Sequence, residues 1–145
     1  MNNLRILNSK EKKKIIEQVK NHFGIENLEL DYIFLMSDER KVYLVSEDAA
    51  RVELDMLRVN SLGLYFGAFE DNFRLSIEGA QLIGRKAKKN VVELNDDTKW
   101  LEGNDIEVSG ENGLKIVKCK NDFLGTGQLK NGTLINYVSK ERRIK

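Results

Sequence analysis

Proline is absent from this chain, and cysteine and histidine each occur once. A single cysteine excludes an internal disulfide framework, and one cysteine with one histidine offers no conventional metal site. No apolar run approaches the roughly 20 residues needed to cross a bilayer, and the N-terminus lacks the apolar core of a secretory signal. We therefore expect a cytoplasmic, folded protein that binds no metal and does not associate with membranes.

The sequence offers little that could support catalysis. Cys119 alternates in phase with Val117, which favours a small buried hydrophobe over a nucleophile, and no acidic pair stands out as an acid/base couple. The run Leu124-Gly125-Thr126-Gly127 resembles a nucleotide-binding loop, but such a loop opens a helix, whereas this one leads to an Asn131-Gly132 turn. We expect a barrel strand at this run, no catalytic residues, no cofactor and no enzyme activity.

Residues 1–77 predict a small α/β domain with an antiparallel sheet. Ser9 is expected to cap an amphipathic helix that ends near Gly24, and Ser46 to cap a second helix that buries Ala50, Leu54 and Leu57. Alternating or crowded apolar residues predict strands at 4–7, 29–36, 41–45, 61–69 and 73–77.

Two glycines stand out in the strand predicted at 61–69. Gly63 and Gly67 fall on one face of this strand, beside Tyr65 and Phe69. Glycines on a strand face admit a close neighbour or a bend. If the two aromatic rings are exposed, they could anchor a protein partner.

Residues 78–145 change character. A short helix is expected at 78–88, and turn signals separate the brief strand-like runs that follow, with Asn131-Gly132 typical of a type I′ hairpin turn. Many short strands at close spacing favour a small β-barrel. The strands are expected at 90–94, 104–108, 114–120, 125–130 and 133–138. We therefore predict two domains, 1–77 and 78–145.

Positive charge is concentrated in the second half of the chain, although the formal net charge is only +1. Residues 1–77 hold 11 Lys and Arg against 13 Asp and Glu, whereas residues 78–145 hold 13 against 10. A polyanion is therefore expected to be drawn to the second half.

The basic residues there are the best candidates for a binding site. A helix over 78–88 would place Arg85, Lys88 and Lys89 on one face, and Lys118 and Lys120 project from one side of their strand. Such groups neutralise phosphates, and Tyr137 could add a stacking platform, although an ordinary solvated basic face is the alternative. The residues predicted to bind RNA are Arg85, Lys86, Lys88, Lys89, Lys140, Arg142 and Arg143.

Four segments in order resemble a PUA domain, the RNA-binding pseudo-barrel of pseudouridine synthases and archaeosine transglycosylases. These segments are Phe73-Arg-Leu-Ser-Ile-Glu-Gly-Ala-Gln-Leu-Ile-Gly, Trp100-Leu-Glu-Gly-Asn-Asp, Asp122-Phe-Leu-Gly-Thr-Gly and Asn136-Tyr-Val-Ser-Lys-Glu-Arg-Arg-Ile. The strand-to-helix turn at 42–47 and the strand at 61–67 are similar to the pre-60S assembly factor built from an α/β domain and a PUA domain. The last segment is similar to the C-terminal region of Fmu/Sun-type rRNA cytosine methyltransferases, although Ser139 replaces their proline.

The resemblance implies an α+β protein in which a small α/β domain with an antiparallel sheet is packed on a PUA pseudo-β-barrel. It implies a non-catalytic, archaeal-type protein that binds rRNA or tRNA in ribosome biogenesis or RNA modification. It places the RNA on the face formed by the 78–89 helix and the C-terminal strand. Two alternatives stay open: an adaptor that docks a ribosome-assembly factor, or a subunit that presents RNA to a separate cytosine-C5 methyltransferase. The chain itself holds no proline, and so no Pro-Cys catalytic motif of such methyltransferases.

Overall fold

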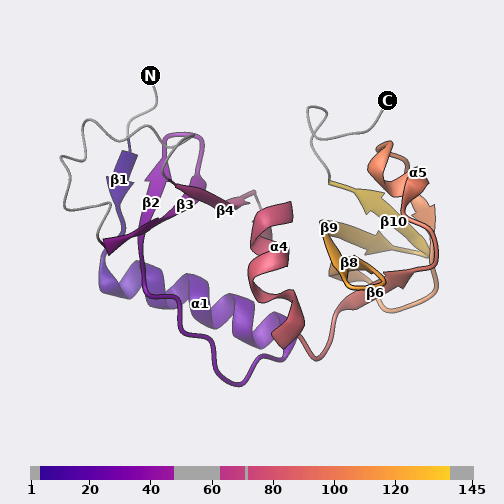
Figure 1. Ribbon diagram of the computed structural model, residues 1–145, viewed down its shortest axis with the longest axis horizontal. Helices are drawn as coiled ribbons and strands as arrows, with labels where there is room; N and C mark the ends of the chain where they lie inside the picture. The colour runs from indigo at the N-terminus through magenta and orange to yellow at the C-terminus, as the bar shows by residue number, and fades with distance from the viewer. Residues whose placement is uncertain (1–3, 48–62, 71, 138–145) are drawn as a thin grey trace. The chain divides into compact units, whose positions relative to one another are not determined.

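The computed structural model describes residues 4–47, 63–70 and 72–137. The chain divides into two compact units, Met1–Arg74 and Leu75–Lys145, and each sheet of the protein has five strands (Figure 1). The first sheet is antiparallel and carries a helix, and the second is a curled, barrel-like sheet. The expected α+β class is therefore confirmed.

The first sheet has the strand order β1-β2-β3-β4-β5, and its neighbours follow the order of the chain. Helix α1 (Ser9–Phe23) lies below these strands in the view of Figure 1 and buries Ile15, Val19 and Phe23. The Lys12 ammonium donates to the Tyr32 carbonyl at 2.8 Å, which ties the helix to β2. The strands are β1 (Leu4–Ile6), β2 (Tyr32–Ser37), β3 (Lys41–Ser46), β4 (Leu64–Phe69) and β5 (Phe73–Leu75).

The prediction that Ser9 caps the first helix is wrong, because Asn8 is the N-cap. The Asn8 side chain accepts from the backbone N–H of Glu11 at 2.8 Å, and the Glu11 carboxylate accepts from the backbone N–H of Asn8 at 3.1 Å. This reciprocal capping box satisfies two backbone donors at once. The predicted end is confirmed, since Gly24 adopts a left-handed conformation with φ of 64°.

Several strand limits differ from the prediction, and the differences at β2 and β5 have a local cause. β2 begins at Tyr32 rather than at residue 29, because buried Leu28 and Leu30 belong to a lead-in that makes no ladder. β5 ends at Leu75, because the Ser76 side chain accepts from the backbone N–H of Gly79 at 2.9 Å and starts a helix. The helix predicted after Ser46 lies outside the described residues apart from its first positions, and Ser46 itself ends β3.

The close neighbour expected at the glycines of β4 is found at Gly67. A Cβ added there would lie 2.4 Å from the Arg74 carbonyl oxygen and 2.7 Å from the Phe73 ring. Tyr65 and Phe69 are half-buried rather than free, since Tyr65 packs on Tyr43 and Phe69 on Phe73 with ring centroids 5.5 and 5.1 Å apart.

The second sheet has the strand order β6-β8-β9-β10-β7, so β6 and β7 are its two edges. β6 pairs with β8 in parallel, and the other neighbours pair antiparallel. Asn131 and Gly132 join β9 to β10 with φ of 50° and 84°, which confirms the type I′ turn. The strands are β6 (Val91–Leu94), β7 (Ile106–Glu107), β8 (Gly113–Cys119), β9 (Asp122–Lys130) and β10 (Thr133–Asn136).

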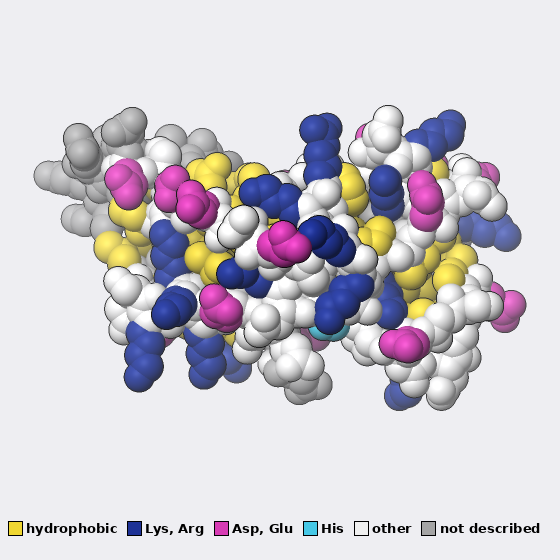
Figure 2. All heavy atoms as spheres, turned by 90° about the horizontal axis from the view of Figure 1, so that it is seen from below, with side chains coloured by type: hydrophobic (Ala, Val, Ile, Leu, Met, Phe, Trp, Pro, Cys, Tyr) yellow, Lys and Arg dark blue, Asp and Glu magenta, His cyan; other side chains and the backbone are white. Residues whose placement is uncertain are grey.

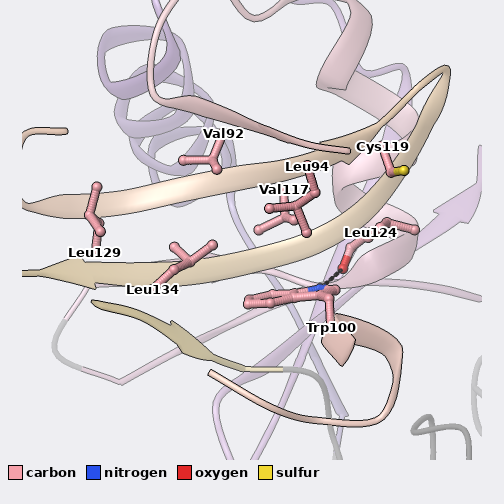
Figure 3. Close-up of a cluster of buried hydrophobic side chains, with 8 residues drawn as sticks. All are labelled: Val92, Leu94, Trp100, Val117, Cys119, Leu124, Leu129 and Leu134. Carbon is pink, nitrogen blue, oxygen red and sulfur yellow. Dashed lines mark hydrogen bonds between the residues drawn. The ribbon is translucent and has the colours of Figure 1, made fainter. Parts of the chain in front are cut away.

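Trp100 is the centre of the second core. It lies on α5 (Thr98–Leu101), a short helix that the sequence did not predict, and it is fully buried. Figure 3 shows its ring across the cluster of buried side chains, with the indole nitrogen donating to the Leu124 carbonyl at 3.1 Å. The Asn136 side chain donates to the carbonyls of Trp100 and Asn104 at 2.7 and 3.0 Å. The other cluster members are Val92, Leu94, Val117, Cys119, Leu124, Leu129 and Leu134.

The glycine-rich run is part of strand β9, as predicted, and other groups approach it closely. A Cβ on Gly127 would lie 2.7 Å from the Trp100 ring, and Gly125, with φ of 93°, faces Ile77 on α4 (Ile77–Ile83). Between them, the Thr126 hydroxyl donates to the Leu75 carbonyl at 3.0 Å. No nucleotide-type helix follows the glycines, because the strand continues to Lys130.

Candidate nucleic-acid interface

The helix predicted over 78–88 is shorter than expected. α4 ends at Ile83, and a single 3-10 turn, η2 (Gly84–Lys86), follows it. Gly84 lies directly against the Phe123 ring of β9, where an added Cβ would come within 2.4 Å of a ring carbon. Lys88 and Lys89 lie beyond both helices, so the predicted shared helix face does not exist.

These basic residues nevertheless come together around an open hollow of about 610 Å³, which we call the basic hollow. Among the residues that the structure describes, no Asp or Glu lines it. Its cations come from three places: Arg85 from η2, Lys88 and Lys89 from the connection to β6, and Lys118 from β8. The full lining is Gly84, Arg85, Ala87, Lys88, Lys89, Asn90, Val91, Lys118, Asn121 and Phe123.

Asn90 holds the lysine-bearing connection in place. Its φ of 60° turns the chain into β6, and its carbonyl accepts from the backbone N–H of Ile116 at 2.8 Å. Its side-chain oxygen accepts from the buried ammonium of Lys115 at 2.8 Å. The connection that carries Lys88 and Lys89 is therefore fixed to β8 at the mouth of the hollow.

Three of the four cations of the basic hollow, Arg85, Lys88 and Lys89, are exposed. Neither Arg85 nor Lys89 makes an ion pair with a carboxylate in the described part of the chain. The Lys118 ammonium lies 5.6 Å from the centroid of the Phe123 ring, a cation–π distance. Figure 2 shows one face of the molecule, on which Lys and Arg side chains are interspersed with Asp and Glu. Clustered cations of this kind attract anions.

Only some of the residues predicted to bind RNA line the basic hollow. Arg85, Lys88 and Lys89 line one hollow, whereas Lys86 is exposed but does not line it. The other predicted RNA-binding residues, Lys140, Arg142 and Arg143, lie outside the described residues.

Lys118 was missing from the predicted set of RNA-binding residues. Its position on a strand beside Lys120 was visible in the sequence, but its proximity to Lys88 depends on the parallel pairing of β6 with β8. Lys120 takes φ of 56° in the turn after β8 and does not line the hollow.

Within residues 4–47, 63–70 and 72–137, no group of three or more His, Cys, Asp or Glu side chains could hold a metal ion. Cys119 is buried in the core, as its phase predicted. Among the helices described, none is long and apolar enough to span a bilayer.

Fold and site together define a two-module protein: a sheet-and-helix unit followed by a barrel-like unit with a basic hollow. The first module matches the family model described as NIP7/UPF0113, pre-PUA domain, over residues 4–77, just over half of the chain. The chain therefore belongs to the NIP7/UPF0113 pre-PUA family. The model described as Methyltransferase RsmF PUA domain matches residues 89–144. No curated protein matches the chain. The family resemblance seen in the sequence is thus confirmed.

Proposed function

We propose that this protein is a cytoplasmic, non-catalytic RNA-binding protein that binds rRNA or its precursor during ribosome assembly through the basic hollow. The observation that carries the proposal is the set of cations around that hollow, with no Asp or Glu among its described lining residues. The matches to a NIP7-type pre-PUA domain and to a PUA domain support the same class of function.

The chemistry of the hollow suits RNA that is partly single-stranded. Lys88, Lys89 and Lys118 can neutralise phosphates as point charges, while the planar guanidinium of Arg85 can contact a phosphate through two donors or stack on a base. Proteins that read RNA sequence usually do so at loops and bulges, where unstacked bases are accessible to side chains.

The remaining predicted contacts extend this proposal. Lys86 lies next to the hollow in η2, and Lys140, Arg142 and Arg143 follow β10 in the chain. We propose that these residues add phosphate contacts at the edge of the bound RNA. Their contribution can be separated from that of the hollow by single charge reversals, and Lys86→Glu should weaken binding less than Lys89→Glu.

The test compares two double variants of the full chain in binding to rRNA fragments. Arg85→Glu/Lys89→Glu reverses two charges of the hollow, and Lys99→Glu/Lys130→Glu reverses two exposed charges of the same unit that lie outside it. Both variants have the same net charge. We expect the first to lower affinity about tenfold or more and the second much less. Equal losses would mean that the RNA responds only to the overall charge and would reject the basic hollow as the site.

A second candidate function follows from the match to the PUA domain of a methyltransferase. In this version the protein presents RNA to a separate rRNA or tRNA cytosine-C5 methyltransferase and supplies no catalytic group. Purification of the tagged full chain should then recover methyltransferase activity, and Arg85→Glu/Lys89→Glu should reduce methylation of RNA without releasing the enzyme. If the purified protein carries no methyltransferase activity, this second candidate is rejected and RNA binding in ribosome assembly stays the proposed function.

A further inference from the structure

The second unit contains another hollow, of about 450 Å³ and of opposite charge, which we call the acidic hollow. Glu93, Asp96 and Glu107 line it, and Lys99 is the one cation among its described lining residues. Its remaining lining residues are Leu94, Asn95, Ile106 and Val108. Neither the predicted RNA-binding residues nor the basic hollow includes any of these side chains.

The two edges of the curled sheet meet at this hollow. β6 and β7 are the first and last strands of the sheet order β6-β8-β9-β10-β7, yet residues of both line the same space. In the described residues each of these strands pairs on one side only, β6 with β8 and β7 with β10. The hollow therefore marks the open seam of the barrel-like sheet.

The seam offers backbone hydrogen-bonding groups. The carbonyl of Asn90 accepts from the backbone N–H of Ile116 on β8. Backbone N–H and C=O groups alternate in direction along a strand, so the backbone groups of Val92 and Leu94 also face β8. The backbone groups of Val91 and Glu93 therefore point to the unpaired side of β6. An unpaired strand edge is a template for another strand.

The side chains around the seam define what would fit. Leu94 belongs to the buried core, and Ile106 and Val108 are partly buried against it, so the floor is apolar. Glu93, Asp96 and Glu107 are exposed around that floor. The backbone N–H and the hydroxyl of Thr98 donate to Asp96 at 2.9 and 2.7 Å and hold the pKa of Asp96 below its usual value, so its carboxylate stays ionised at neutral pH.

We propose that the acidic hollow docks an extended segment of a partner protein in which basic and apolar residues alternate, and that this segment pairs with the free edge of β6. Its apolar side chains cover Leu94, Ile106 and Val108, and its Lys or Arg side chains lie opposite Glu93 and Glu107. Main-chain hydrogen bonds provide affinity in this mode of recognition, and the alternate side chains provide specificity.

Strand β6 would then connect two separate binding sites. Its start, at Asn90 and Val91, lines the basic hollow, while its end, at Glu93 and Leu94, lines the acidic hollow. At about 3.3 Å per residue, Val91 and Leu94 are roughly 10 Å apart. The negative charge of the acidic hollow repels RNA phosphates. RNA would therefore bind at the start of β6 and the basic segment at its end.

The experiment titrates the full chain with a short end-blocked synthetic peptide in which Lys and Val alternate, while backbone amide NMR signals are recorded. We expect the largest shifts at 91–95 and 106–108. A peptide of the same sequence that is N-methylated on alternate residues lacks the backbone N–H donors along one of its two edges. It can no longer pair with β6 through that edge and should bind weakly. Glu93→Lys/Glu107→Lys should reduce affinity for the unmodified peptide about tenfold, because two attractive contacts become repulsive.

The matched control is Glu102→Lys/Glu111→Lys, which reverses two exposed carboxylates of the same unit outside the acidic hollow. It should change affinity by no more than about twofold. Equal losses in the two variants, undiminished binding of the N-methylated peptide, or shifts confined to other parts of the chain would overturn the proposal. An rRNA fragment that shifts the amides at 91–95 and 106–108 but leaves those around Arg85 unchanged would overturn it as well.

Discussion

The two units use charged residues in different ways. In the first unit, Arg5 pairs with Glu11 at 2.9 Å and Arg74 with Glu70 at 2.8 Å. The Arg40 guanidinium lies 5.2 Å from the Phe69 ring centroid. In the second unit, Arg85 and Lys89 have no such carboxylate partner in the described part of the chain. These three arginines of the first unit contact side chains of their own unit, whereas Arg85 and Lys89 of the second unit are available to a ligand.

This difference explains why counting charges is a weak guide to function. The halves of the chain differ modestly in net charge, but the four ion pairs found in the described residues all lie in the first unit. Some charges of the second unit also gather in two hollows: the charged residues that line one are cations, and those that line the other are three carboxylates and one lysine. The predictions below test whether the two units depend on the interactions assigned to each.

The largest stability effect is expected at Trp100. Trp100→Ala removes a fully buried ring and its hydrogen bond to Leu124, and it should destabilise the second unit by about 3–5 kcal/mol. Urea unfolding followed by circular dichroism would measure the loss. Trp100→Phe keeps most of the ring and should cost less. If both variants unfold like the wild type, Trp100 is not the centre of this core.

A smaller loss is expected at Asn136, the buried polar residue that closes β10 onto the Trp100 helix. Asn136→Ala leaves the carbonyls of Trp100 and Asn104 without their amide donor and should cost about 1–3 kcal/mol. Thermal unfolding would measure it, with the exposed Asn112→Ala as a comparison that removes one surface hydrogen bond. A larger loss in the comparison variant would contradict the assignment.

In the first unit, Asn8→Ala should cost about 1 kcal/mol, because it removes the N-cap of α1. Ser9→Ala serves as the control, since Ser9 is the first helical residue and not the cap. Chemical denaturation of the two variants distinguishes them directly. A greater loss of unfolding free energy for Ser9→Ala than for Asn8→Ala would support Ser9 as the N-cap.

The smallest effect concerns the acid stability of the same unit. The Arg5 side chain and the backbone N–H of Asn8 donate to Glu11 and hold its pKa below its usual value of about 4.3. Because the pKa of Glu11 is lower in the folded state, its ionised carboxylate stabilises the fold at pH values above its usual pKa. This stabilisation disappears as the pH falls through the lowered pKa. Glu11→Gln should flatten this part of the stability profile between about pH 5 and 3, and an unchanged profile would contradict the assigned pairing.

Much of the fold was predictable because local signals and final packing agree. The alternation in β3 and β4, Gly24 after α1 and the Asn131-Gly132 turn all lie where the sequence places them. α5 was missed because its four residues are too few to show a helical period, and Trp100 is fixed there by hydrogen bonds to distant strands.

The sites were predictable only in part. Arg85, Lys88 and Lys89 were identified because they are adjacent in sequence, although the helix face expected to join them does not exist. Lys118 enters the basic hollow through the pairing of β6 with β8, and the acidic hollow joins two edge strands separated along the chain. Contacts of this kind depend on sheet topology, for which the sequence carries no local signal.

The most direct test of the central claim is the salt dependence of rRNA binding for the wild type and Arg85→Glu/Lys89→Glu. If about four phosphates are contacted, wild-type affinity should fall roughly 50-fold between about 50 and 200 mM salt, at a slope near −0.7 per phosphate. The double variant should lose about half of that slope, while Lys99→Glu/Lys130→Glu should keep the wild-type slope. Identical slopes for the wild type and Arg85→Glu/Lys89→Glu would contradict binding at the basic hollow.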